Sequence, residues 1–163
     1  MRTLIACVVS ILLSAPALAQ QAAPAAASRT MVSASEVQAM IAKAKTDRKD
    51  NAPIVAQSLL QLAPYNVSLE YRASVGNAAV HETEAELFYV VDGSATLVTG
   101  GTLTDSTRTG ANLTGKGIQG GVSRKVAKGD FVMVPEGQPH WFSAIDGTVV
   151  LMSLHLPRAP GAK

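Results

Sequence analysis

Short segments in which apolar and polar residues alternate dominate the chain from residue 53 onward. In residues 67–72 every second side chain is apolar, which is the period of a strand with one buried face. Clusters of Gly, Pro, Asn and Asp separate these segments. We expect strands at residues 54–62, 67–72, 86–91, 95–98, 131–134, 141–144 and 149–156. Many short strands with almost no helix between them predict an all-β protein, an antiparallel sandwich or barrel.

Asp-Gly pairs stand between neighbouring strands at two places. Asp92-Gly93 separates residues 86–91 from 95–98, and Asp146-Gly147 precedes the last predicted strand. Because an Asp-Gly pair readily adopts the positive φ angles of a two-residue turn, each pair predicts a tight hairpin.

Residues 99–124 are rich in Gly, Thr and Ser and contain few large apolar side chains. We expect a long loop here, of the kind that is either functional or poorly ordered.

The first nineteen residues have the organisation of a secretory signal peptide. Arg2 precedes an apolar run at residues 4–13, and Ala17-Leu18-Ala19 forms a small-x-small cleavage site before Gln20. The apolar run is too short to span a bilayer, although an uncleaved anchor helix is the alternative. We therefore expect a periplasmic or secreted protein with no membrane association after cleavage. Because Cys7 is the chain's one cysteine, the mature protein would contain no disulfide and no thiolate ligand.

Two further segments precede the strands. Residues 20–32 are mostly Ala- and Pro-rich and predict a flexible linker. Residues 33–52 form an N-terminal helical segment, in which Ser33 and Glu36 fit a capping box and apolar residues recur at helical spacing. A helix over residues 34–45 follows, and the β-barrel domain occupies residues 53–158.

The composition excludes two broad classes of protein. Apolar residues make up 47% of the 163 residues and charged residues 16%, so global disorder is excluded. The formal net charge is only +2, whereas nucleic-acid binding needs a concentrated basic surface. We therefore expect a small-molecule ligand or substrate and no nucleic-acid partner.

Two segments carry residue types that suit a metal site. In the first, Glu86 follows His81 by five positions, and six residues separate Glu86 from Gly93. In the second, five residues separate Gly129 from Pro135, and the series continues as Pro135-x-Gly137-x-x-His140.

Together, these two segments resemble the motifs of the cupin family over about residues 66–157. The resemblance implies a double-stranded β-helix, a jelly-roll-like barrel, here with a short N-terminal helix, and it implies a homodimer. The first cupin motif has two histidines at i and i+2. His81 suits the second position, which leaves Ala79 in the first. The other alignment, with His81 first and Thr83 second, makes the spacing to Glu86 too short.

The resemblance assigns His81, Glu86 and His140 to one divalent transition metal. Two imidazoles and one carboxylate suit Zn, Mn, Fe, Ni or Cu, and they leave coordination positions open. With Ala79 in the place of a histidine, this is a three-ligand site. A barrel that has lost the metal is the alternative.

His155 and Tyr71 are the candidate catalytic residues. If the strand face that carries His155 looks into the barrel, His155 could replace the missing ligand or transfer protons. The alternative is a hydrogen-bonded histidine near a strand end. Tyr71 is either a pocket phenol or a core aromatic residue.

Similar cupins act as dioxygenases, isomerases, epimerases, lyases and decarboxylases, so the fold does not choose the reaction. We expect a metal-dependent enzyme that acts on a small organic substrate. The alternative is a non-catalytic module that binds a small ligand or a metal. An open coordination site beside a pocket with a proton-transfer group would favour the enzyme.

Overall fold

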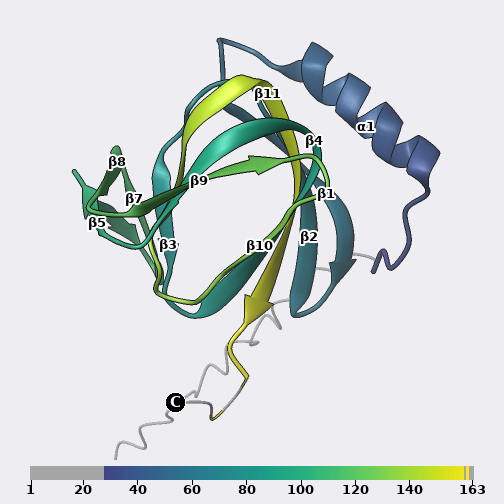
Figure 1. The fold of residues 1–163 in the computed structure, drawn as a ribbon. Coiled ribbons are helices and arrows are strands. Elements are labelled where there is room, and N and C mark those ends of the chain that lie inside the picture. Colours follow the sequence, from purple (N-terminus) through teal and green to yellow (C-terminus); the bar gives the residue numbers. More distant parts are fainter. Residues whose placement is uncertain (1–27, 160, 162–163) are drawn as a thin grey trace, which may run out of the picture.

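The structure is a computed structural model that describes residues 28–159 and 161. The predicted signal peptide and the first part of the linker lie outside these residues. Antiparallel strands form a barrel, as the all-β prediction expected, and one helix packs on its outside (Figure 1). The elements in chain order are α1 (Ala34–Asp47), β1 (Ile54–Leu62), β2 (Tyr65–Arg72), β3 (Ala78–His81), β4 (Glu84–Thr99), β5 (Thr102–Thr104), β6 (Thr107–Thr109), β7 (Asn112–Gly115), β8 (Gly117–Gln119), β9 (Val122–Ala127), β10 (Phe131–Val134) and β11 (His140–Pro157).

Helix α1 begins where the capping box predicted. The Ser33 side chain accepts from the Glu36 backbone N–H, and the Glu36 carboxylate accepts from the Ser33 backbone N–H at 2.7 Å. The helix ends at Asp47, two residues beyond the predicted end. Its apolar face covers the outer face of β1 and β2, where Ala44 is fully buried. The capping box and the burial of this face together stabilise the helix.

The two longest strands, β4 and β11, form the centre of the barrel wall. They pair antiparallel from His140↔Thr99 to Pro157↔Glu84. Strand β11 also pairs with β2 and β3, while β4 also pairs with β9 and β10. Figure 1 shows these two strands curving round the barrel. Strands β2, β3, β9 and β10 therefore pair directly with one of these two strands, and β1 and β7 join the sheet through β2 and β3.

The two predicted hairpins are wrong, because each Asp-Gly pair lies inside a continuous strand. Gly93 lies within β4 and Gly147 within β11, and both have positive φ angles, of 78° and 74°. The register between the two strands shifts from Ile145 to Val149, the residue that pairs with Gly93. The glycines therefore lie at bulges: Gly147 is among the unpaired residues 146–148 of β11, and Gly93 pairs with the next residue, Val149. A bulge bends a strand without reversing it. The strands run past both bulges because each half of β4 finds a partner in β11.

The long loop predicted at residues 99–124 is also wrong, because the structure folds most of it into short strands. Strand β7 pairs with β3 and β6, and β5 pairs with β8. Thr has high strand propensity, and the unpaired edge of β3 supplies a partner for β7. This segment consequently adds to the sheet beside the metal-ligand candidate His81, which pairs with Asn112.

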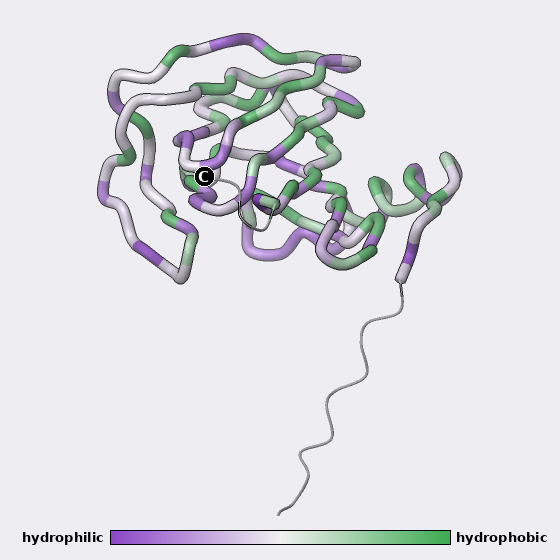
Figure 2. Tube along the Cα trace, turned by 90° about the horizontal axis from the view of Figure 1, so that it is seen from below, coloured by the Kyte–Doolittle hydropathy of each residue, from purple (hydrophilic) through white to green (hydrophobic). Residues whose placement is uncertain are grey.

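Apolar side chains fill much of the barrel interior. Phe88, Val90, Leu97, Phe142 and Leu151 belong to one buried cluster. Figure 2 shows hydrophobic and hydrophilic residues interspersed along the chain. Three polar residues are nevertheless buried among the described residues, and they are Glu86, His140 and Ser153. Their burial marks the candidate site, because buried polar groups need partners.

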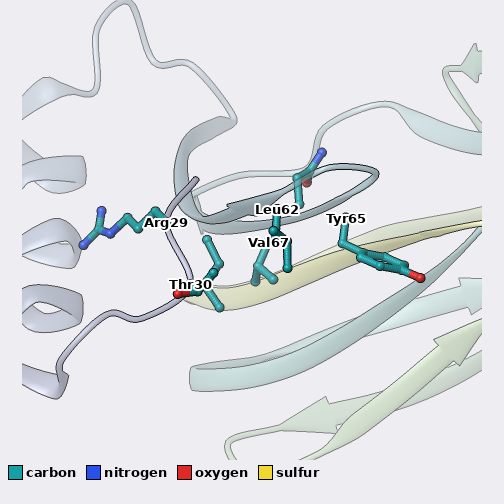
Figure 3. A pocket seen from close by; sticks show the side chains of 7 residues that line it. Arg29, Thr30, Leu62, Tyr65 and Val67 are labelled. Atoms are coloured by element: carbon teal, nitrogen blue, oxygen red, sulfur yellow. The ribbon is translucent and has the colours of Figure 1, made fainter. Parts of the chain in front are cut away.

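A shallow apolar cavity of about 190 Å³ lies between residues 29–30, which precede α1, and the neighbouring ends of β1 and β2 (Figure 3). Arg29 exchanges two backbone hydrogen bonds of 2.8 Å with Gln61 at the edge of β1. Leu62, Tyr65 and Val67 line the cavity beside it. No histidine or carboxylate of the described residues lines it, and it shares no lining residue with the polar cluster inside the barrel.

Apolar side chains are also exposed on the outside of the barrel. Phe131 is 68% exposed and Met133 52%, and the Phe131 ring lies 4.5 Å from that of Tyr89. The homodimer expected from the family resemblance stays a prediction. Among residues 28–159 and 161, no helix is long and apolar enough to cross a membrane.

The bulge at Gly93 predicts a stability difference between two glycine substitutions. A Cβ at Gly93 would lie 2.0 Å from the Thr148 carbonyl oxygen, whereas a Cβ at Gly147 meets nothing within 4 Å. Both positions have positive φ, which costs a non-glycine residue about 1–2 kcal/mol. We expect Gly147→Ala to lose about that much stability, and Gly93→Ala to lose roughly 1–3 kcal/mol more through overpacking. Urea denaturation measures both, and equal losses would contradict the bulge geometry.

Candidate metal centre

The three predicted ligands come together inside the barrel from three different strands. His81 ends β3, Glu86 lies in β4 and His140 begins β11. Glu86 Oε2 lies 3.1 Å from His140 Nε2 and 3.4 Å from His81 Nε2. Glu86 and His140 are buried, and His81 is half-buried. One ligand atom from each residue lies within 4.8 Å of the others, so the three could hold one ion.

The turn between β10 and β11 places His140 beside the other two residues. Val134 at the end of β10 pairs with Glu86. The Gly137 backbone N–H, at the tip of the turn, donates to the His81 carbonyl oxygen at 2.7 Å. Gly137 has a φ of 71°, which glycine adopts without strain. The glycine of the Pro-x-Gly sequence thus bonds the turn to the end of β3, three residues before β11 begins at His140.

One oxygen of Glu86 shows that these residues fit a cation. Glu86 Oε2 is buried, and among the described residues no group donates to it with hydrogen-bond geometry, although the two imidazole nitrogens lie 3.1 and 3.4 Å away. A buried carboxylate oxygen without a partner is costly. Ligands bound at about 2.0–2.2 Å to one ion lie roughly 3–3.5 Å apart, which agrees with the two measured separations from Oε2. A divalent ion between the carboxylate and the two imidazoles would satisfy this oxygen.

Electrostatics keep the Glu86 carboxylate ionised. Burial by itself raises its pKa, but the imidazoles of His140 and His81 outweigh burial, and the pKa lies well below its ordinary value. The Ser153 hydroxyl donates to the other oxygen, Oε1, and lowers the pKa further. Glu86 is therefore charged at neutral pH, the form that binds a metal.

Asn112 orients His81. Its side-chain oxygen Oδ1 lies 2.9 Å from His81 Nδ1, so it accepts a hydrogen bond in the tautomer protonated at Nδ1. Nε2, which faces Glu86, then carries the lone pair, as second-shell partners of metal-binding histidines usually arrange. Glu86 raises the pKa of His81, burial opposes the rise, and Asn112 adds to it.

His155 adjoins the same cluster and brings a second carboxylate with it. Its ring lies 4.9 Å from that of His81. His155 Nδ1 lies 3.1 Å from Glu84 Oε2, and Nε2 lies 3.5 Å from Glu86 Oε1. The face of β11 that carries His155 therefore looks into the barrel, which was the condition for a role in the site. His81, Glu84 and His155 form a second group whose ligand atoms lie within 4.8 Å of one another.

Tyr71 does not reach the site, so its prediction as a catalytic residue is corrected. It is 8% exposed and packs with Leu59, Leu69 and Val150 beneath α1. Successive strand residues point to opposite faces, and Tyr71 lies on the outer face of β2. Its neighbour Arg72 lies on the inner face, with its guanidinium over the Phe142 ring.

The sequence did not single out Ser153, Glu84 or Asn112 as site residues. Ser153 and Glu84 lie two positions from His155 and Glu86 on the same strand faces, so a period-two count from either neighbour could have found them. Asn112 gave no such signal, because only the pairing of β7 with β3 places it beside His81.

A cavity of about 210 Å³ borders His140. Side chains from β1, β2, β3, β7 and β11 line it, including Arg72, Ala79, Thr114 and Trp141. Ala79 pairs directly with His140, and its small side chain leaves this space beside the candidate metal ligand.

A jelly-roll-like barrel, with a His-Glu-His cluster inside that could hold a metal ion, defines the class of protein. The family model described as Cupin matches residues 44–158. The chain therefore belongs to the cupin family, as the two sequence motifs predicted.

Several solved structures are similar to this chain at low sequence identity. KdgF from Halomonas sp. is 16% identical, with a TM-score of 0.51, and the match covers 69% of this chain and 86% of that one. Fe(II) HppE is 16% identical, with a TM-score of 0.50, and the match covers 68% of this chain and 54% of that one. A cupin superfamily protein from Desulfitobacterium hafniense DCB-2 is 17% identical over 68% of this chain and 83% of that one, with a TM-score of 0.46. No curated protein matches the chain.

The raised pKa of His81 predicts how metal affinity depends on pH. A protonated imidazole cannot bind a metal. Because the pKa of His81 lies above its ordinary value of 6.5, we expect affinity for Zn²⁺ or Co²⁺ to begin falling above pH 6.5 as the pH is lowered. Below the pKa, each titrating ligand should cost roughly tenfold in affinity per pH unit. Competition titrations between pH 8 and 5.5 measure this change.

Asn112→Ala provides the matched control, because it removes one cause of the raised pKa of His81. The onset of the fall should move to lower pH in this variant. An affinity that stays constant from pH 8 to 5.5 would contradict imidazole ligation.

Proposed function

We propose that the protein is an exported, metal-dependent enzyme that acts on a small organic molecule. His81, Glu86 and His140 hold one divalent transition metal, which is Zn, Mn, Fe, Ni or Cu by the chemistry of its donors. The reaction is of the dioxygenase, isomerase or lyase type. The observation that carries the proposal is the buried Glu86 oxygen without a hydrogen-bond partner. A cavity borders His140 of the same cluster, and the His155 ring lies beside that of His81.

A bound divalent ion would act as a Lewis acid that polarises a substrate oxygen or lowers the pKa of water. The protein contributes the geometry. Ser153 and Asn112 fix the orientation of Glu86 and His81, and such outer partners usually matter nearly as much as the ligands themselves. The cavity beside His140 receives the substrate, and its apolar walls strengthen electrostatic interactions by excluding water.

His155 is the proton-transfer group of the proposed enzyme. In the proposed neutral tautomer, the proton of His155 is on Nδ1, which lies 3.1 Å from Glu84 Oε2, and the Nε2 lone pair is directed toward the cluster. An imidazole in this state takes a proton from a substrate or water and returns it later. The carboxylate of Glu84 stabilises the imidazolium formed in between.

Two features favour this enzyme over the alternative, a non-catalytic module that binds a ligand or a metal. The cavity beside His140 provides room for a substrate at the ligand cluster. The inward direction of His155 provides the proton-transfer group. A non-catalytic module with a closed metal shell would need neither a substrate cavity nor a proton-transfer group.

Metal content and turnover, measured on the same preparations, test the enzyme. Wild-type protein dialysed against each of the five ions should retain one ion per chain by elemental analysis, and Glu86→Ala should retain none. Products from a panel of small organic acids, alcohols and sugars are followed by mass spectrometry. We expect His155→Gln to keep the metal and to lose roughly 10²–10⁴-fold in turnover, the usual contribution of a general acid or base.

Tyr71→Phe is the matched control for that experiment, because Tyr71 lies outside the site. It should keep both metal and turnover. Equal trace metal in wild type and Glu86→Ala would refute the metal site. Metal binding without turnover in any preparation would favour the non-catalytic module.

Export follows from the proposed signal peptide, and it is tested by the mature N-terminus. Expression of the full chain in a Gram-negative host, followed by fractionation and N-terminal sequencing, should give a periplasmic or secreted protein that begins at Gln20. Ala17→Leu and Ala19→Leu should block cleavage, because the peptidase needs small residues there. Recovery of the intact chain in the cytoplasm would refute export.

A further inference from the structure

Among the described residues, one formally charged side chain lines the cavity beside His140, that of Arg72. Arg72 lies on the inner face of β2, and its side chain is only 11% exposed. No carboxylate among the described residues lines the cavity. Asn77 and Thr114, which also line it, offer an amide N–H and a hydroxyl as neutral donors. The polar part of this cavity is therefore suited to an anion.

The surroundings of Arg72 hold its guanidinium in place. Glu70 Oε2 lies 2.8 Å from Nε and 2.6 Å from Nη2. The Phe142 ring lies 4.6 Å from Cζ and supports the guanidinium plane. Glu70 therefore engages one edge of the guanidinium, through Nε and Nη2. Glu70 does not line the cavity, so the guanidinium and not its partner carboxylate faces a ligand.

We propose that this cavity binds the carboxylate group of a small organic anion, with Arg72 as its recognition residue. Arg72, Asn77 and Thr114 donate hydrogen bonds to the carboxylate oxygens. The rest of the molecule extends toward His140, along the apolar wall formed by Ala79 and Phe142. This inference rests on the proposed function, because it names the substrate class of the same site.

The size and charge of the cavity narrow the ligand further. Its volume of about 210 Å³ is below the range of about 300–1,000 Å³ that is usual for drug-sized ligands, so a short chain fits best. Glu70 already compensates part of the Arg72 charge. One partly compensated guanidinium matches a singly charged carboxylate better than a doubly charged phosphate.

Trp141 makes occupancy of the cavity directly observable. It is the chain's only tryptophan, and it lines the same cavity with its indole N–H bonded to the Gly76 carbonyl oxygen at 2.9 Å. Intrinsic fluorescence therefore reports on this place in the molecule. The titration is carried out on protein stripped of metal by a chelator. Failure of the metal site and failure of the carboxylate site are then distinguishable.

The experiment compares carboxylates with amides of the same shape. Propionate and butyrate should change the Trp141 fluorescence saturably, and propionamide and butyramide should bind roughly tenfold more weakly or worse, the effect of one charge-assisted hydrogen bond. Arg72→Met should reduce carboxylate affinity to that of the amides. Arg124→Met, which removes an exposed arginine of β9, should leave the affinity within about twofold of wild type.

Two further variants decide the result if Arg72→Met does not fold. Arg72→Lys keeps the charge without the planar fork, and it should keep the preference for carboxylate with an affinity several-fold lower. Ala79→Leu fills the cavity and leaves Arg72 in place, so it should abolish the fluorescence response. Equal affinity for carboxylates and amides, or carboxylate affinity that is unchanged in Arg72→Met, would overturn the proposal. Tighter binding of inorganic phosphate than of propionate would overturn the carboxylate assignment.

Discussion

The antiparallel pairing of β4 with β11 is the constraint on which the rest of the structure depends. It runs from His140↔Thr99 to Pro157↔Glu84, and β2, β3, β9 and β10 each pair with one of these two strands. The pairing sets His155 opposite Glu86. The short turn after β10 then returns the chain to His140 beside the same carboxylate. Loss of this register would move the ligand candidates to the other face, because side chains alternate with a period of two.

The barrel contains a polar cluster inside an otherwise apolar interior, and the cluster is organised around Glu86. One oxygen of this carboxylate accepts from Ser153, and the other faces two imidazoles without a hydrogen bond. Burying an unsatisfied carboxylate oxygen costs stability unless a cation completes the environment. The metal, the proton-transfer group and the carboxylate-binding cavity are thus three proposals about one continuous region, which extends from Glu84 past His140 to Arg72.

Parts of the fold could be predicted because local physical chemistry determines them. The capping box of α1 needs only Ser33 and Glu36 at the right spacing, and the helix begins there. The structure at the two Asp-Gly pairs could not be predicted in this way. A hairpin turn and a bulge both use glycine at positive φ, and the local sequence is the same for both. Only the presence of β11 beside both halves of β4 selected the bulges.

For the site, the sequence by itself determined the barrel family and the three residues of the cluster, because the motif spacing fixes where His81, Glu86 and His140 lie on their strands. It could not determine which face of a strand looks inward. His155 and Tyr71 were equal candidates in the sequence, and the tertiary structure separated them: His155 contacts the cluster, whereas Tyr71 packs beneath α1. Because Tyr71 lies on the outer face of β2, its neighbour Arg72 lies on the inner face and lines the cavity. Asn112 lies beside His81 only because β7 pairs with β3. Alternation fixes which residues share a face, but only packing against a helix or across a barrel decides which face is buried inside.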